Sequence, residues 1–353
     1  MNPSVPTAPV LDISDFSVVY RVPGGDVRAV NDVSLALHPG EIVGLAGESG
    51  SGKSTLAYAM CRLLRAPALI TVGSVTYSGR RAASPTDVLQ LSSHELQHLR
   101  WREIAIVFQS AMNALNPVLN VRDQITDVIH AHLRMSRGDA LEKAGSLLDL
   151  VGIPRSRLRS YPHELSGGMR QRVMIAMALA ADPEIVIMDE PTTALDVVVQ
   201  RDILAQIVEL KEQLGFAILF ITHDLSLLLE LADRIAVMYA GQLMEVGTAA
   251  EIQHRAAHPY TRGLLTSFPS LHGPRRELAG IPGTPPDLRN PPAGCPFLPR
   301  CGYGTDACRT VDMHLERLAS PAGLEHVTAC PFVRPETPAP DRPSASAEQE
   351  LQA

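Results

Sequence analysis

The sequence of 353 residues has no apolar run long enough to cross a bilayer. The apolar stretch at residues 173–181 is stopped by Asp182, well short of the roughly 20 residues that a membrane helix needs. Residues 1–4 also lack the basic and then apolar pattern of a signal peptide. We therefore expect a cytoplasmic protein, in which any association with a membrane is made through a partner.

The sequence also lacks an excess of basic residues. The chain carries 31 Lys and Arg against 38 Asp and Glu, a net charge of -7, which argues against nucleic acid as the main partner because phosphate neutralisation needs a basic footprint. Only five cysteines are present, and in the expected compartment they are not predicted to form structural disulfides. A hydrophobic content of 45% indicates a globular chain, long enough for one large core and a smaller appended domain.

A phosphate-binding P-loop is the strongest local signal in the sequence. The pattern G-x-x-x-x-G-K-[ST] is matched between an apolar strand-like run and a helix start. The stretch comprises Gly47, Glu48, Ser49, Gly50, Ser51, Gly52, Lys53, Ser54 and Thr55. Its glycines let backbone N–H groups point at phosphate oxygens, and the helix N-terminus adds its positive dipole end. Lys53 is predicted to reach the β- and γ-phosphates, and the Ser54 hydroxyl to ligate Mg²⁺.

Apolar runs and helical patterns alternate along the chain around this loop. Residues 11–37 predict two antiparallel strands around a turn at 23–25. Further strands are predicted at 42–46, 185–188 and 217–221, helices from 123, at 140–151, 167–180 and 197–214, and a closing hairpin within 235–246. Strands alternating with helices predict an α/β fold with a parallel sheet of the P-loop NTPase type.

Two acidic residues end a predicted buried strand. Asp189 and Glu190 follow the apolar run at 185–188, and buried carboxylates are costly unless they meet a cation. Asp189 suits Mg²⁺, held through water, and Glu190 suits a general base that orients the attacking water. The alternative is a pair of acidic residues that caps the next helix.

A second anion-binding helix start is predicted at residues 165–171. One protein rarely needs two phosphate-binding helix starts for one nucleotide, so a symmetric pairing is indicated, in which this site covers the γ-phosphate held by another subunit. A plain helix cap at Ser166 is the alternative. The segment begins with Leu165, Ser166, Gly167, Gly168 and Met169.

Three further residues are weak signals taken singly. Tyr20 precedes the P-loop and suits either stacking on adenine or packing in the sheet. His223 follows a strand and can hydrogen-bond a γ-phosphate, and Gln109 follows the apolar run at 104–108 and can touch Mg²⁺ or water.

Taken in order, these motifs resemble the ATPase subunits of ABC transporters. The resemblance covers residues from about 10 to 250. It rests on the P-loop, Gln109, residues 165–168, residues 187–190, residues 194–196 and His223. It implies an ABC-type nucleotide-binding domain with an antiparallel β subdomain and a helical subdomain at about 91–175. It also implies adenine-contact, Q-loop, D-loop and switch roles for Tyr20, Gln109, Asp196 and His223.

Three other stretches resemble the oligopeptide/dipeptide permease branch of that family. They are residues 108–118, 168–176 and 258–261. Met169 replaces the glutamine that is commonest in the wider family, and methionine is usual in this branch. The branch implies a first-type ATPase at the cytoplasmic face of the cell membrane. Its implied partners are a second ABC ATPase subunit, two transmembrane permease subunits and an extracytoplasmic peptide-binding protein, with no nucleic acid.

Four cysteines form a constellation near the C-terminus. Cys295, Cys301 and Cys308 lie close together in a proline-rich stretch, and Cys330 follows at a distance. Thiolates bind soft metal ions and clusters, and similar modules in the resembled branch can hold a [4Fe–4S] cluster. Zinc is the alternative because four thiolates suit a closed tetrahedral site; four reduced thiols without metal is the other. Cys61 is predicted to be a packed core residue.

These expectations describe an ATP-hydrolysing subunit that energises an importer of oligopeptides or dipeptides. The resembled branch also handles nickel complexes and glutathione. Outside transport, a DNA-acting ATPase would carry long heptad helices or zinc modules inside the head, and a translation-type protein would carry two heads; this chain shows neither feature. We expect a nucleotide-binding domain at 1–254, a C-terminal module with the four cysteines at 255–335, and a disordered tail at 336–353.

Overall fold

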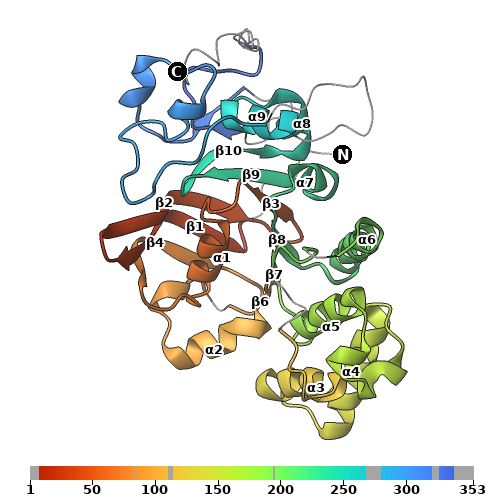
Figure 1. Ribbon diagram of the computed structural model, residues 1–353. Coiled ribbons are helices and arrows are strands. Elements are labelled where there is room, and N and C mark those ends of the chain that lie inside the picture. The colour runs from red at the N-terminus through yellow and green to blue at the C-terminus, as the bar shows by residue number, and fades with distance from the viewer. Residues whose placement is uncertain are drawn as a thin grey trace.

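A computed structural model describes residues 8–82, 84–109, 114–193, 195–267, 280–319 and 326–337. Two sheets and several helical layers make up this part of the chain (Figure 1). The described residues include no helix that combines the length and the apolar character needed to cross a membrane.

The N-terminal hairpin forms as the alternating pattern predicts. β1 (Leu11–Val22) and β2 (Gly25–Leu37) pair in antiparallel register around Gly24, whose φ of 96° is in the region that favours glycine. β4 (Ala68–Tyr77) and β5 (Thr86–Asp87) complete a sheet in the order β2-β1-β4-β5. The sequence analysis placed no strand at β4.

The second sheet carries the parallel core that the sequence predicts. Its order is β11-β12-β10-β9-β3-β8-β7-β6, and neighbours from β9 to β6 run parallel. The parallel strands are β3 (Ile42–Ala46), β6 (Ile104–Val107), β7 (Ile185–Asp189), β8 (Ala217–Ile221) and β9 (Arg234–Tyr239). Nearly all of their residues are buried, as continuous apolar strands covered on both faces must be. Strand β3 lies between β9 and β8, so the P-loop that follows it leaves the sheet near its middle.

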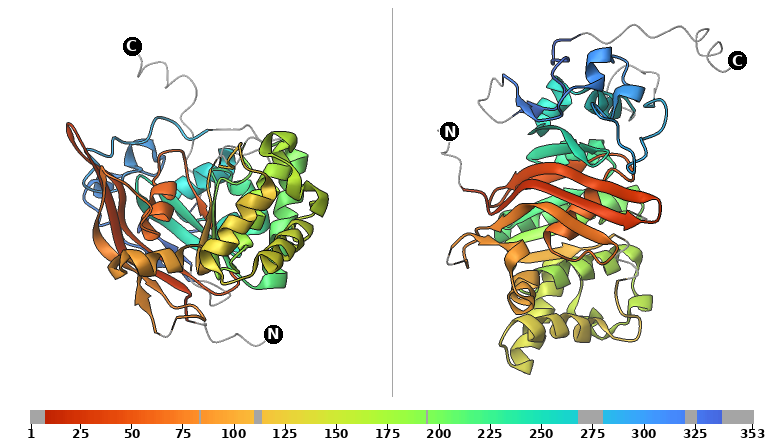
Figure 2. Two further views of the ribbon diagram at one scale, coloured as in Figure 1. Left: turned by 90° about the horizontal axis from the view of Figure 1, so that it is seen from below. Right: turned by 90° about the vertical axis from the view of Figure 1, so that its left-hand side faces the viewer.

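Two apolar clusters fill the two sides of the parallel sheet. One joins the antiparallel sheet, α1 (Lys53–Met60) and one face of the parallel strands. The other cluster lies between the opposite face of the parallel strands and helices later in the chain. Helix α1 therefore lies between the two sheets, as the left view of Figure 2 shows.

The described residues between 91 and 179 contain four α-helices and the strand β6. The helices are α2 (Ser93–Arg102), α3 (Val121–His132), α4 (Arg137–Leu150) and α5 (Gly167–Leu179). Side chains of Ser92, Asn120, Ser136 and Ser166 cap their N-termini by accepting backbone N–H groups. In Figure 1, α3, α4 and α5 gather at the lower end of the molecule.

Two of the remaining α-helices follow the parallel strands β7 and β8, and two follow the last strand of the hairpin that β9 begins. They are α6 (Val197–Leu214), α7 (Leu225–Leu231), α8 (Ala249–Arg255) and α9 (Pro259–Ser267). The predicted helix at 197–214 coincides with α6, which begins after the N-cap Asp196 and ends at Gly215 with a φ of 73°.

The C-terminal segment is built onto the parallel sheet. After β10 (Gln242–Thr248), the short strands β11 (Glu316–Arg317) and β12 (Val327–Thr328) extend the sheet, with β12 antiparallel to β10. The chain before β11 contains two short 3₁₀ helices, Leu298–Arg300 and Asp306–Arg309. The two residues of the predicted tail that are described, Glu336 and Thr337, contact the body of the protein; the rest of the tail lies outside the described residues.

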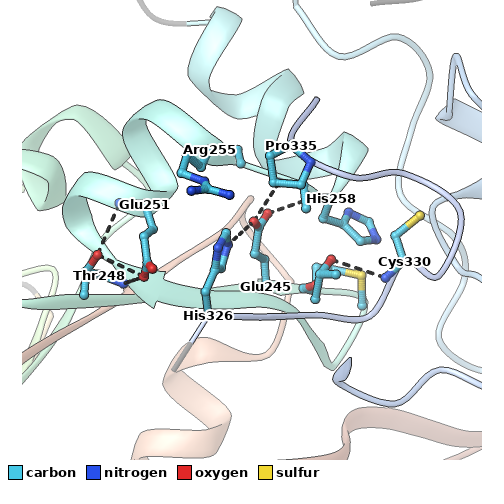
Figure 3. Close-up of polar contacts among 12 residues, drawn as sticks. Glu245, Thr248, Glu251, Arg255, His258, His326, Cys330 and Pro335 are labelled. Atoms are coloured by element: carbon cyan, nitrogen blue, oxygen red, sulfur yellow. Dashed lines mark hydrogen bonds and ion pairs between the residues drawn. The ribbon is translucent and has the colours of Figure 1, made fainter. Parts of the chain in front are cut away.

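A buried carboxylate on β10 holds this segment against the rest of the chain (Figure 3). Glu245 of β10 accepts hydrogen bonds from the backbone N–H groups of Ala257 and His258, at 2.7 and 2.9 Å, and from Nε2 of His326 at 2.8 Å. Burial lowers the pKa of His258 to about 4, so this ring is neutral at pH 7 and its Nδ1 accepts the N–H of Tyr260. The three hydrogen bonds to Glu245 offset the cost of burying its side chain away from water.

Candidate functional site

The P-loop curls tightly where β3 meets α1. Gly47 and Gly52 have φ values of 150° and 103°, and a Cβ on either would lie 2.1 Å from a backbone oxygen, that of Met238 or Ala29. Only glycine fits at these two positions. The loop is therefore fixed against the sheet, with the N-terminus of α1 opening onto it.

Lys53 directs its ammonium group into the curl of the loop. Its Nζ donates hydrogen bonds to the carbonyl oxygens of Gly47 and Glu48, at 2.7 and 2.8 Å. Burial lowers the pKa of Lys53, while the charges of Glu190, Asp189 and Glu48 oppose that shift. In this position the ammonium group of Lys53 can bind anionic phosphate oxygens.

Asp189 lies at the end of β7 beside the start of α1. It is fully buried, and it accepts hydrogen bonds from the Ser54 hydroxyl at 3.0 Å and from the Tyr58 hydroxyl at 2.6 Å. Burial, followed by the bond to Asp189, raises the pKa of Tyr58, which keeps its hydroxyl protonated as a donor. A carboxylate and a hydroxyl side by side are oxygen ligands of the kind that Mg²⁺ prefers. Sequence reasoning missed Tyr58, which has no motif of its own.

Glu190 gathers polar groups from the ends of several elements. Its Oε2 accepts Nε2 of Gln109 at 2.9 Å and the Thr193 hydroxyl at 3.1 Å, and its Oε1 lies 3.2 Å from Nδ1 of His223. The structure thus brings Gln109, Glu190 and His223 together, three residues that the sequence analysis singled out separately. Thr193 was not among them. Glu190 has a φ of 45°, an uncommon conformation for a non-glycine residue.

Tyr20 on β1 lies beside the loop. Its hydroxyl is 3.2 Å from Oγ1 of Thr55, the second residue after Lys53. The ring is part-buried, so it stands near the loop without being enclosed in the core.

The second predicted helix start is built as a capped N-terminus. The side chain of Ser166 accepts the N–H of Met169 at 3.3 Å, and a Cβ on Gly168 would lie 2.6 Å from Cγ1 of Val199 in α6. Asp196 caps α6 by accepting the N–H of Val199. The second predicted helix start and the D-loop residue Asp196 are therefore adjacent, and Figure 1 shows α5 among the lower helices, apart from α1.

Some predicted motif residues lie outside the described residues. These are residues 110–113 of the stretch that resembles the peptide-permease branch, and Ala194 before Asp196.

The four C-terminal cysteines line one pocket. Cys295, Cys301, Cys308 and Cys330 share it with Phe297 and other apolar side chains. In the described part of the chain, no group of three or more His, Cys, Asp or Glu side chains has the arrangement of a metal site. Burial raises the pKa of both Cys295 and Cys301 to about 11, so these thiols are protonated at pH 7. Cys61 is buried in the core as predicted.

Comparison with known families places two matches along the chain. Residues 30–193 match the family described as ABC transporter, and residues 244–308 match the one described as oligopeptide/dipeptide transporter, C-terminal region.

Curated relatives resemble nearly the whole chain. The oligopeptide transport ATP-binding protein OppD of Escherichia coli is 46% identical over 85% of this chain and 87% of its own length. The protein of the same name from Bacillus subtilis is 42% identical over 95% of this chain and 92% of its own length. A putative peptide import ATP-binding protein of Brucella melitensis is 45% identical over 85% and 91%, respectively.

Solved structures share the fold. A dimeric ATP-binding cassette in a post-hydrolysis state with ADP and Pi has a TM-score of 0.59 and 28% identity, and covers 68% of this chain and 98% of that one. The chain cbiO1 from Clostridium perfringens, described as part of an ABC transporter complex, has a TM-score of 0.59 and 25% identity, covering 70% and 91%.

Proposed function

Because this chain belongs to the ATP-binding subunits of ABC transporters, in the oligopeptide/dipeptide branch, we propose that it hydrolyses ATP to energise the import of oligopeptides or dipeptides. The single observation that carries the chemistry is the grouping of Gln109, Thr193 and His223 on Glu190. The relatives named for peptide transport support the substrate class.

The P-loop residues 47–55 are proposed to hold the triphosphate. Gly47 and Gly52 allow the backbone to close on it, and Lys53 supplies the positive charge at the β- and γ-phosphates. Tyr20, next to Thr55, is proposed to contact the adenine.

Mg²⁺ is proposed to accompany the nucleotide. Ser54 and Asp189 would hold it, with Gln109 near its water shell, and their oxygen atoms fit the ion. When bound, it neutralises charge that develops on the transferred phosphoryl group.

Glu190 is proposed as the general base of hydrolysis. An ionised carboxylate has about four acceptor positions; Gln109 and Thr193 donate to Oε2 and His223 faces Oε1, so there is room to accept one hydrogen bond from a water molecule. The same three neighbours fix the direction in which the carboxylate points. His223 is proposed to exchange its contact with Glu190 for one with the γ-phosphate.

Leu165, Ser166, Gly167, Gly168 and Met169 are proposed to complete the site of a second ATPase subunit. The first N–H groups of a helix have no partner within the helix and can face an anion, as proposed for the N-terminus of α5. Asp196 caps the start of α6, next to it. A dimeric relative supports this pairing. Two transmembrane permease subunits and an extracytoplasmic binding protein are proposed to complete the importer at the cytoplasmic face of the membrane.

The cysteine pocket is proposed to hold a [4Fe–4S] cluster, with zinc as the alternative. Support comes from the four thiols that line one pocket. The protonated thiols must lose their protons to become ligands, so metal binding at this pocket weakens with acidification. We propose that the nucleotide-binding domain spans residues 1–254, the cysteine module 255–335 and the tail 336–353.

Co-purification of the full chain with its membrane subunits tests this function. ATPase activity of that complex, with its binding protein, should rise with oligopeptides or dipeptides. Stimulation only by nickel complexes or by glutathione would assign the substrate to those classes instead. Salt-dependent binding and stimulation by DNA, without co-purifying membrane subunits, would overturn the transport function.

A further inference from the structure

Arg300, in the C-terminal segment, contacts the P-loop, although 252 residues separate it from Glu48. Nη1 and Nη2 of Arg300 donate hydrogen bonds of 2.6 and 2.9 Å to the two carboxylate oxygens of Glu48, the second residue of the loop. The side chain of Arg300 is only 4% exposed. A two-pronged bond of this kind fixes the direction of the carboxylate as well as its position.

The guanidinium group is held from every side. Its Nε donates to the carbonyl oxygen of Pro282 at 2.7 Å, and Nη1 also donates to the Tyr239 hydroxyl at 3.2 Å. It lies 5.6 and 5.9 Å from the ring centres of Tyr239 and Phe297, a range in which a cation is attracted to an aromatic face. Arg300 is therefore a rigid anchor rather than a mobile surface side chain.

Every polar group of Glu48 is engaged. Its N–H donates to the Tyr260 hydroxyl at 2.8 Å, its carbonyl oxygen accepts Nζ of Lys53 at 2.8 Å, and its carboxylate is taken by Arg300. Tyr260 belongs to α9 and packs against Phe297. Two of these three contacts, those of Tyr260 and Arg300, come from the C-terminal part of the chain.

The position of Arg300 is set by the turn between two cysteines. Arg300 ends the 3₁₀ helix Leu298–Arg300, which lies between Cys295 and Cys301, and its own N–H donates to the carbonyl oxygen of Phe297 at 2.9 Å. Cys295 and Cys301 both line the cysteine pocket. Loosening this turn would move the anchor that holds Glu48.

We propose that Arg300 is a positioning residue for nucleotide binding, through which the folded cysteine module holds the P-loop in its phosphate-binding shape. This inference rests on the proposed ATP site. Loss of Arg300 has two consequences. The first turn of the loop loses its anchor, and the carboxylate of Glu48 is left without its counter-ion beside a site that must accept a polyanion.

The test is the ATP affinity of the full-length protein, measured by calorimetry with Mg²⁺-ATP. Arg300→Met should weaken affinity by about tenfold, which corresponds to ~1.4 kcal/mol. Arg262→Met is the matched control, because Arg262 holds the C-terminal chain at Tyr303, Arg334 and Thr337 and has no described contact with the P-loop. Its affinity should stay at the parent value even where its melting temperature falls.

A double-mutant cycle separates positioning from a general structural role. In the Glu48→Gln background, Arg300→Met should weaken affinity much less than in the parent, because the ion pair is already gone. Arg300→Lys, which keeps the charge but loses the two-pronged bond, should fall between the parent and Arg300→Met. It serves in the same cycle if Arg300→Met does not fold.

Three results would overturn the inference. The first is parent-like affinity of both Arg300 variants, the second is an equal loss of affinity in Arg262→Met, and the third is full additivity of Arg300→Met with Glu48→Gln. A parent protein that binds no ATP would instead overturn the proposed function itself.

Discussion

Gln109 donates a 2.9 Å hydrogen bond from Nε2 to Oε2 of Glu190, and so joins the end of β6 to the carboxylate that follows β7. These two residues are separated by the helices α3, α4 and α5 in the sequence. A displacement of that helical region would therefore move Gln109 and change its hydrogen bond to Glu190. This geometry suits an ATPase that must couple hydrolysis to movement of a permease.

Glu190→Gln should keep ATP binding and reduce hydrolysis by at least about a hundredfold, because general-base catalysis contributes factors of this order. The amide still accepts a hydrogen bond, but it is a far weaker proton acceptor. Steady-state phosphate release from the assembled complex measures this. Glu209→Gln, the same exchange at an exposed position of α6, is the control. Hydrolysis near the parent rate in Glu190→Gln would remove the residue from its proposed role.

Tyr58→Phe should raise the Mg²⁺ concentration needed for half-maximal hydrolysis by about tenfold. The change deletes the hydroxyl that holds Oδ2 of Asp189, and loss of a group that orients a metal ligand weakens the site by about tenfold or more. Tyr77→Phe is the control, since Tyr77 also bonds carboxylates, those of Glu103 and Glu184, away from the P-loop. An unchanged Mg²⁺ midpoint in Tyr58→Phe would show that Asp189 does not depend on this contact.

Ser166→Arg and Lys53→Ala should affect different sites. Lys53→Ala should weaken nucleotide binding by the isolated subunit, because it deletes a charge at the phosphates. Ser166→Arg should leave that binding intact and abolish hydrolysis at the partner's site, where the added bulk meets the γ-phosphate. Equilibrium binding by the single subunit, followed by turnover in the complex, distinguishes them. A loss of affinity in Ser166→Arg as severe as in Lys53→Ala would refute the shared-site geometry.

Protein purified without oxygen should be brown, with iron and sulfide in stoichiometric amounts. Cys301→Ser should remove the colour and expose the region from about 280 to 335 to protease, since bound metal supplies folding free energy to such modules. Cys61→Ala should keep the iron, because Cys61 is buried in the core away from the pocket. Colourless protein with one zinc would support the alternative ligand. A metal-free protein whose cleavage is indifferent to Cys301→Ser would refute both metals.

Local signals made much of the fold predictable. The strands β3 and β8 are continuous apolar runs, and α6 lies between a capping Asp196 and Gly215, so their limits follow from residue types alone. Gln109, Glu190 and His223 could each be singled out because each follows a predicted strand, and parallel strands end at one edge of a sheet; their contacts with one another were not predicted.

Other contacts left no trace in the local sequence. Arg300 and Glu48 are 252 residues apart, and nothing in the spacing around either one indicates a partner. The pairing of β12 with β10 could not be predicted because β12 has only two residues, too few to show a pattern. The sequence around Tyr58 is that of an ordinary helix, and only the folded structure shows its hydrogen bond to Asp189. These features depend on packing between distant segments, which a single sequence does not reveal.

Uptake of a labelled oligopeptide into vesicles carrying the assembled importer tests the central claim most directly. With ATP on the side of this subunit and the binding protein on the other, the parent complex should accumulate peptide, and Glu190→Gln should abolish accumulation while ATP still binds. Glu209→Gln should transport as the parent does. Peptide uptake that is independent of ATP, or equal in Glu190→Gln and the parent, would contradict an ATPase that drives peptide import through Glu190.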